Sequence, residues 1–360
     1  MSQKIGVSLS RIEDLEAGRG YVDMAALHAM RRAFEVRSYD LFFSVKSREA
    51  VRFRLSSSQP LSRGQRSFLL GKLSIYLEDY RDLEKKAADF RPLAIADLIG
   101  SRAWVGPTAA ALACRAAMEI DPTKAIDDIQ SLLEEKGIKV FCKRVAYANF
   151  HSLSMSEKEP GGPLIAVNLK DSWNRCRFLL AAELGSLIMR PESYRVSLVD
   201  EEPVAQMEAE KFAEYFLMPD QALRLMWAEK SHLPFFEKLI KVHVFFGLSL
   251  EKILSRVFKL KLDCDLIKIE EKIDQNDKDN FIYKNFPINS SFIENYLKKE
   301  NKVTNDFCPN QRLNNLIGLA VARGQITVSR GAEILRIAKG AVAFLAHLAS
   351  KCLEIPTPRP

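Results

Sequence analysis

A single carboxylate stands in the middle of an apolar helical stretch of this chain. The segment 177–189 reads RFLLAAELGSLIM, and Glu183 is the only charged residue between Arg177 and Arg190. Because burying an unpaired charge is unfavourable by several kcal/mol, Glu183 must be solvated, hydrogen-bonded or protonated in the folded chain. At 100° per residue, one stripe of the predicted helix holds Arg175, Phe178, Ala182, Ser186 and Met189.

The segments around this helix predict a small α+β unit. Two short apolar runs, 139–143 and 163–168, precede the helix and have the length of strands. A second helical segment, 206–218, follows and ends at Pro219. We therefore expect a mostly α protein of the α+β class with a small sheet.

The position of Glu183 matches the glutamate of the zincin motif H-E-x-x-H. In that motif two imidazoles one helical turn apart hold zinc, and the glutamate acts as general base on the metal-bound water. In this chain the two imidazole positions are Ala182 and Ser186. Neither is a practical zinc ligand, because zinc binds thiolate, imidazole and carboxylate groups.

Together these segments resemble the ImmA/IrrE family of zinc metallopeptidase-like proteins. Members read H-E-L-G-H where this chain reads A-E-L-G-S, and a second motif ends in L-M-P in both. The resemblance implies a minimal zincin-like domain. The matching residues are Arg177, Phe178, Leu180, Ala181, Glu183, Leu184, Gly185, Ala209, Phe212, Ala213, Leu217, Met218 and Pro219.

The resemblance also implies a third zinc ligand, and that position is Gln206. A neutral amide binds zinc poorly, so all three metal positions, Ala182, Ser186 and Gln206, are degenerate, while Glu183 survives as a relic of the general base. Glu208 and Glu210 lie nearby, but a shift of two residues turns a helical side chain elsewhere. We therefore expect no metal and no other cofactor; zinc would be present only in an active member of the family.

The space left by two missing imidazoles has two interpretations. Phe178 and Met189 fill it as core, or it remains a small pocket with Glu183 and Ser186 on its wall. The second interpretation gives the domain a place to bind a ligand or a peptide.

The N-terminal segment resembles part of a lambda-repressor-like helix-turn-helix of the xenobiotic-response-element (XRE) class. The predicted recognition helix runs from Ser8 to Glu16, and its DNA-binding candidates are Ser8, Ser10, Arg11 and Arg19. The head is truncated, because little precedes this helix. Three explanations stay open: the start codon is assigned too late, the DNA-binding head is shortened, or the segment is a helical remnant kept for packing. We expect DNA binding to be weak or vestigial.

Composition limits the remaining possibilities. A chain of 360 residues suggests several structural units. It contains no run of eighteen apolar residues, so we expect no membrane span. The first residues do not form a secretory signal, and six scattered cysteines suit a reducing compartment, so we expect a cytoplasmic protein. The net charge of +7 permits nucleic acid as a partner without requiring it.

The predicted organisation has six parts. Residues 1–45 form the truncated head, and 46–120 a helical connector, with a loop over 51–62 and helices over 62–90 and 108–119. Residues 121–225 form the peptidase-like domain, opening with a helix over 122–136. Closing helices occupy 226–262, with Ser249 as an N-cap, and a variable polar segment occupies 263–310. Residues 311–355 form a C-terminal helical module, read either as an interaction module or as a hairpin packed on the core.

These patterns favour a non-catalytic regulatory protein. A peptidase-like domain would sense a ligand or hold a protein partner while joined to a vestigial DNA-binding head, with a homodimer among the arrangements it allows. The family resemblance adds a toxin–antitoxin or phage-related setting. Two alternatives stay open: an active zinc metallo-endopeptidase that cleaves a repressor, and a sequence-specific transcriptional regulator.

Overall fold

The computed structural model describes Ser8 and residues 51–55, 61–101, 105–145, 147, 149–156, 163–170, 173–191, 194, 203–263, 310–335 and 337–354. This part of the chain is mostly helical around one four-stranded sheet, which confirms the α+β class. The DNA-binding candidates Ser10, Arg11 and Arg19 lie outside the described residues, as does almost all of the polar segment 263–310.

The sheet contains β1 (Val51–Leu55), β2 (Lys139–Lys143), β3 (Phe150–Met155) and β4 (Leu164–Asn168), in the order β1-β3-β4-β2. β3 runs antiparallel to both β1 and β4, whereas β2 and β4 are parallel. The strands predicted at 139–143 and 163–168 are confirmed. The predicted loop over 51–62 is wrong at residues 51–55, because this segment pairs with β3 as an edge strand of the sheet.

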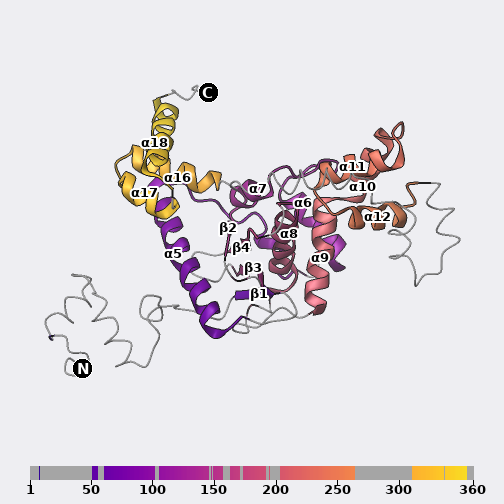
Figure 1. Cartoon of the computed structure of the whole chain (residues 1–360), viewed down its shortest axis with the longest axis horizontal. Helices are drawn as coiled ribbons and strands as arrows, with labels where there is room; N and C mark the ends of the chain where they lie inside the picture. The colour runs from indigo at the N-terminus through magenta and orange to yellow at the C-terminus, as the bar shows by residue number, and fades with distance from the viewer. Residues whose placement is uncertain are drawn as a thin grey trace.

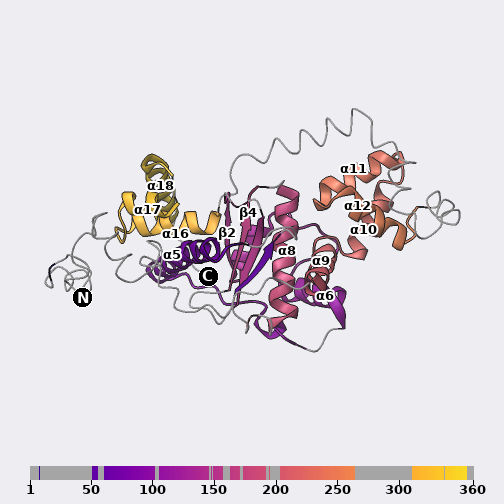
Figure 2. The same cartoon turned by 60° about the horizontal axis from the view of Figure 1, so that its bottom comes forward.

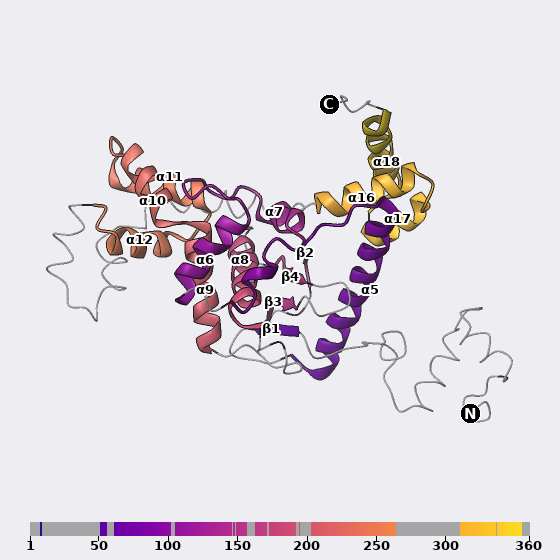
Figure 3. The same cartoon turned by 180° about the vertical axis from the view of Figure 1, so that it is seen from behind.

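Helices cover both faces of this sheet (Figures 1 and 2). On one face lies α8 (Trp173–Met189), with α9 (Pro203–Leu217) and α6 (Gly106–Ala117) packed beyond it. On the other face lies the long helix α5 (Arg63–Ala87), which begins at a capping box formed by Ser62 and Gln65. The view from behind shows the same layers (Figure 3).

The alternation of side chains along β4 divides the apolar interior in two. Ile165 and Val167 join the core around α8 and α9, while Leu164 and Ala166 join the core around α5. All five residues of β4 are buried. A strand covered on both faces needs this continuous apolar run, which is why the sequence pattern revealed it.

The helix predicted over 122–136 is shorter in the structure. α7 spans Ile129–Glu135, and Asp128 caps it by accepting a hydrogen bond from Ser131 N. The buried guanidinium of Arg115 donates to the carbonyl oxygens of Asp121 and Lys124, at 2.5 and 2.7 Å. These bonds take backbone groups that a helix would use itself, so the segment stays irregular.

Three further helices follow α9 at the far end of the molecule: α10 (Asp220–Glu229), α11 (Phe235–Phe246) and α12 (Leu250–Lys259). The predicted N-cap is confirmed, since the Ser249 side chain accepts a hydrogen bond from Lys252 N. Arg256 on α12 donates to the Met218 carbonyl at 3.0 Å and pairs with Asp220. The end of the second motif is thereby tied to the closing helices.

The C-terminal module contains α16 (Gln311–Ala322), α17 (Val328–Leu335) and α18 (Lys339–Glu354). Leu313, Leu316 and Ile317 of α16 join the core around α5. In Figure 1 the module lies over one end of α5. The module therefore packs on the body of the protein. In the part of the chain that the structure describes, no helix has the length and apolar character needed to cross a membrane.

Candidate functional site

The register of the sheet places three polar side chains opposite α8. Arg54 of β1 pairs with Ser152 of β3, and Arg52 pairs with Ser154. Paired residues of an antiparallel ladder project to the same face, and residues two apart on a strand share a face. Arg54, Ser152 and Ser154 therefore point together, while Phe53 and Leu153 point to the core around α5.

Glu183 of α8 meets these three side chains in the interior, with only 1% of its surface exposed. Its Oε1 atom accepts from Arg54 Nε at 3.0 Å and from Ser152 Oγ at 2.7 Å. Its Oε2 atom accepts from Ser154 Oγ at 2.5 Å. A carboxylate with three donors, one of them the Arg54 cation, is satisfied without water, so Glu183 is held as a buried, ion-paired group.

Two further contacts extend this network. The Tyr194 hydroxyl lies 2.7 Å from Ser154 Oγ. On the other side, Arg54 Nη1 lies 3.7 Å from Glu210 Oε1, an atom that also accepts from Gln206 Nε2 at 3.3 Å. The network therefore reaches the third predicted metal position, Gln206, through Glu210. Glu208 is occupied elsewhere, because it forms an ion pair with Arg190.

The two imidazole positions lie on α8 beside Glu183. Ala182 and Ser186 are both buried, and Ser186 Oγ donates to the Ala182 carbonyl at 3.3 Å. Of the other residues on the predicted stripe, Phe178 is buried and Met189 is half-buried. The ammonium group of Lys252 lies 4.5 Å from the centre of the Phe178 ring.

These side chains do not fit a zinc ion. Ala182 offers a methyl group, Ser186 offers a hydroxyl bonded to its own helix, and Gln206 offers an amide bonded to Glu210. Arg54 moreover already supplies a positive charge to Glu183. Among the described residues, no cluster of three or more histidine, cysteine, aspartate or glutamate side chains is arranged to hold a metal.

Two further motif residues, Gly185 and Phe212, determine how closely α8 and α9 pack. A Cβ atom added at Gly185 would lie 2.8 Å from the Phe212 ring, so only glycine lets α9 approach α8 this closely. Phe212 in turn stacks on Phe216, with ring centres 5.6 Å apart. The glycine of the first motif and the phenylalanine of the second thus form one packing contact.

Four residues of the network were not predicted from the sequence: Arg54, Ser152, Ser154 and Tyr194. A signal existed for Arg54, because the segment VRFRL alternates apolar and charged residues as a strand does. Ser8, one of the DNA-binding candidates, is described and exposed.

One family comparison bears on this site. The model of the IrrE N-terminal-like domain, a peptidase family, matches residues 133–258. This match supports the ImmA/IrrE resemblance. It covers β2 to β4, α8 to α11 and nearly all of α12, including Glu183, Ala182 and Ser186. Arg54 lies outside the matched range. Neither a curated protein nor a solved structure matches the chain.

Proposed function

We propose that this chain is a non-catalytic regulatory protein, in which a peptidase-like domain binds a protein partner or a small ligand. The observation that carries the proposal is the buried Arg54–Glu183 pair. A general base must be able to reach a water molecule and take its proton. Glu183 instead accepts three hydrogen bonds in the interior, so it has the environment of a structural group.

The charge of Arg54 also supports this proposal. In a working zincin the metal supplies positive charge beside the glutamate. In this chain the guanidinium of Arg54, delivered by the edge strand β1, is the cation that contacts Glu183. A guanidinium cannot activate water as a Lewis acid, but it neutralises a buried carboxylate. With the Arg54 guanidinium in the place of the metal's charge, the domain keeps the fold of a peptidase without its chemistry.

The N-terminal residues and the biological setting rest on resemblance alone. The resemblance of the N-terminal residues to a helix-turn-helix suggests that the regulator once read DNA, or reads it weakly. A toxin–antitoxin or phage-related setting in the cytoplasm follows from the family resemblance alone. An active metallo-endopeptidase and a sequence-specific transcriptional regulator are the two readings that experiment has to separate from ours.

Metal analysis tests the proposal directly. We expect the purified chain to hold far less than one zinc per molecule, and its melting temperature to be unchanged by chelators. Zinc bound at one per chain, together with chelator-sensitive cleavage of a repressor, would overturn the proposal in favour of the endopeptidase. Tight operator binding that survives physiological salt would favour the transcriptional regulator instead.

A set of variants sharpens this test. The combined change Ala182→His, Ser186→His and Gln206→Glu restores the three ligand types of the family. With Arg54 in place we expect little zinc binding, because a guanidinium beside Glu183 repels a divalent cation. Adding Arg54→Met to the three changes should raise the zinc content. Arg190→Met, which removes a half-exposed arginine that directly follows α8, is the matched control and should not raise it.

A further inference from the structure

A second site lies away from Glu183, between the sheet and the C-terminal module. A cavity of about 350 Å³ is bounded by β2 on one side and by α16 and the end of α17 on the other. This volume falls in the range of small-molecule sites. Its described lining residues are Tyr76, Gln130, Val140, Phe141, Cys142, Lys143, Arg144, Leu169, Asn310, Leu313, Asn314, Leu335 and Ile337.

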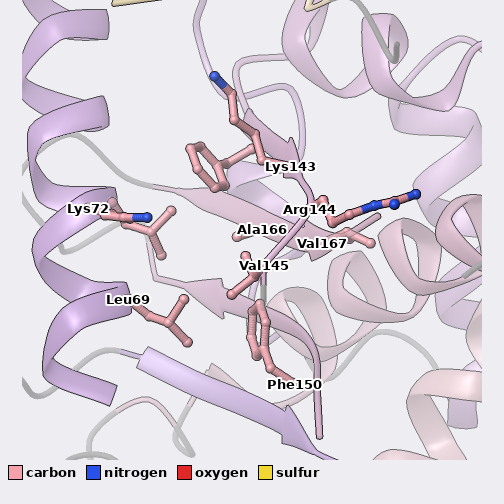
Figure 4. A pocket seen from close by; sticks show the side chains of 10 residues that line it. Leu69, Lys72, Lys143, Arg144, Val145, Phe150, Ala166 and Val167 are labelled. Carbon is pink, nitrogen blue, oxygen red and sulfur yellow. The ribbon is translucent and has the colours of Figure 1, made fainter. Parts of the chain in front are cut away.

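A smaller cavity of about 50 Å³ shares part of this wall. Both cavities are lined by Phe141, Lys143 and Arg144 at the end of β2, and the smaller one adds Lys72 of α5. Figure 4 shows Leu69 and Lys72 reaching from the helix toward the strands, with Val145, Phe150 and Ala166 opposite. Lys143 leaves the strand in a different direction, and its ammonium group lies 3.4 Å from the Leu335 carbonyl of α17.

The charged side chains among the described lining residues of the two cavities are all cations. Lys72, Lys143 and Arg144 are cations, and the described lining residues include neither aspartate nor glutamate. The rest of the larger cavity combines an apolar wall with amide groups. An apolar wall favours a ligand with an apolar part, and the cations favour a ligand with a negatively charged group.

The nearby carboxyl group of Glu134 adds no negative charge to these cavities near neutral pH. Glu134 of α7 accepts a hydrogen bond from Asn310, which lines the cavity. Burial raises the pKa of Glu134 to about 8, against the smaller opposing effects of Asn310, Arg312, Val140 and Tyr80. Below that pH the carboxyl is protonated and adds no negative charge behind the cavity wall.

We propose that the larger cavity binds a small amphiphilic anion, with its apolar body against Phe141, Leu313 and Ile337 and its acidic group beside Lys143. Because the walls come from β2 and from the C-terminal module, such a ligand would hold the module to the body of the protein. The site does not involve Glu183. A failure of the metal experiment would therefore leave this proposal standing, and the reverse also holds.

A pair of dyes tests the charge preference on the unmodified chain. 8-Anilinonaphthalene-1-sulfonate and N-phenyl-1-naphthylamine share one ring system, and only the first carries a negative charge. We expect the sulfonate to bind saturably and about tenfold more tightly than the neutral dye, as an added charged hydrogen bond predicts. Octanoate or octyl phosphate should displace it, which identifies a carboxylate or a phosphate as the preferred group, whereas octanol should not. Equal affinity of the two dyes, or equal displacement by octanol, would overturn the proposal.

Matched variants locate the binding. Lys143→Gln should weaken sulfonate binding about tenfold and leave binding of the neutral dye unchanged, whereas Lys241→Gln, at an exposed position of α11, should change neither.

Asn314→Trp and Ile337→Trp fill the cavity and should abolish binding of the dye. Asn315→Trp, one position along on the exposed side of α16, should not. Circular dichroism checks that each variant is folded. Equal effects of the changes at 314 and 315 would mean that the dye binds elsewhere.

Discussion

The Nε atom of Arg54 lies 3.0 Å from Oε1 of Glu183, although the two residues are 129 positions apart in the chain. One belongs to the edge strand β1 and the other to the central helix α8. Both side chains are almost completely buried, at 1% and 2% exposure. The contact therefore couples the pairing of β1 with β3 to the packing of α8 on the sheet.

Breaking this pair should destabilise the protein strongly. In Arg54→Met, Glu183 keeps its two serine donors but loses its cation, and a buried charge left in this way costs about 3–5 kcal/mol. The double variant Arg54→Met with Glu183→Met should recover most of that loss, since it removes both charges. Urea denaturation of the two single variants and the double variant measures the coupling.

The half-exposed pair Arg190–Glu208 provides the control for this cycle. Arg190→Met should change the free energy of unfolding by less than about 1 kcal/mol, because water screens that pair. If Arg54→Met were as mild as Arg190→Met, Glu183 would have to be solvated, and the structural interpretation of the pair would be wrong.

The sequence predicted the parts of this fold whose signals are local. Strands β2 and β4 were predicted from short apolar runs, and the N-cap of α12 from Ser249. Strand β1 was missed because its partner β3 is about a hundred residues away and because a Ser- and Pro-containing segment follows it directly. The alternation of apolar and charged residues in this segment is a local strand signal, but it does not identify a pairing partner so far away in the sequence.

The candidate site was predicted only in part for a related reason. Glu183 was singled out by its motif, but Ser152 and Ser154 make β3 look solvent-exposed on one face. That face is in fact buried, because the two hydroxyls satisfy Glu183. A buried polar network reverses the usual link between polarity and exposure, so hydrophobic patterning cannot find it.

DNA binding by the N-terminal residues remains a prediction from the sequence. We expect weak binding with little sequence preference, and a logarithmic affinity that falls steeply with salt. If Arg11 and Arg19 contact phosphates, Arg11→Ala and Arg19→Ala should each lower the slope of that salt dependence by about one. Arg224→Ala, at an exposed position of α10, should leave the slope unchanged. Fluorescence anisotropy at several salt concentrations measures these slopes, and equal slopes for all three variants would exclude the two arginines from the interface.

Glu134 should make the stability of the protein depend on pH. Its pKa is raised from 4.5 to about 8 by burial, so between these values the folded state binds more protons than the unfolded state. The free energy of unfolding attributable to Glu134 should therefore fall as the pH rises across this interval, by up to about 1.4 kcal/mol per pH unit. Glu134→Gln should remove that part of the decline in denaturation experiments, whereas Glu135→Gln, at the exposed neighbouring position, should keep it. Parallel pH profiles for the wild type and Glu134→Gln would show that Glu134 ionises normally.

The contact between Gly185 and Phe212 gives the most direct test of how α8 and α9 fit together. A methyl group at position 185 would lie 2.8 Å from the Phe212 ring, so Gly185→Ala forces the helices apart and should lower the free energy of unfolding by about 1–3 kcal/mol. Gly340→Ala is the matched control, because nothing lies within 4 Å of a Cβ atom there. In that exposed helical position alanine should instead stabilise the protein by up to about 1 kcal/mol through its higher helix propensity. Phe212→Leu should relieve part of the penalty in Gly185→Ala, since a smaller side chain leaves room for the methyl group. If both glycine variants were stabilised alike, α8 and α9 would have to be farther apart than the structure places them.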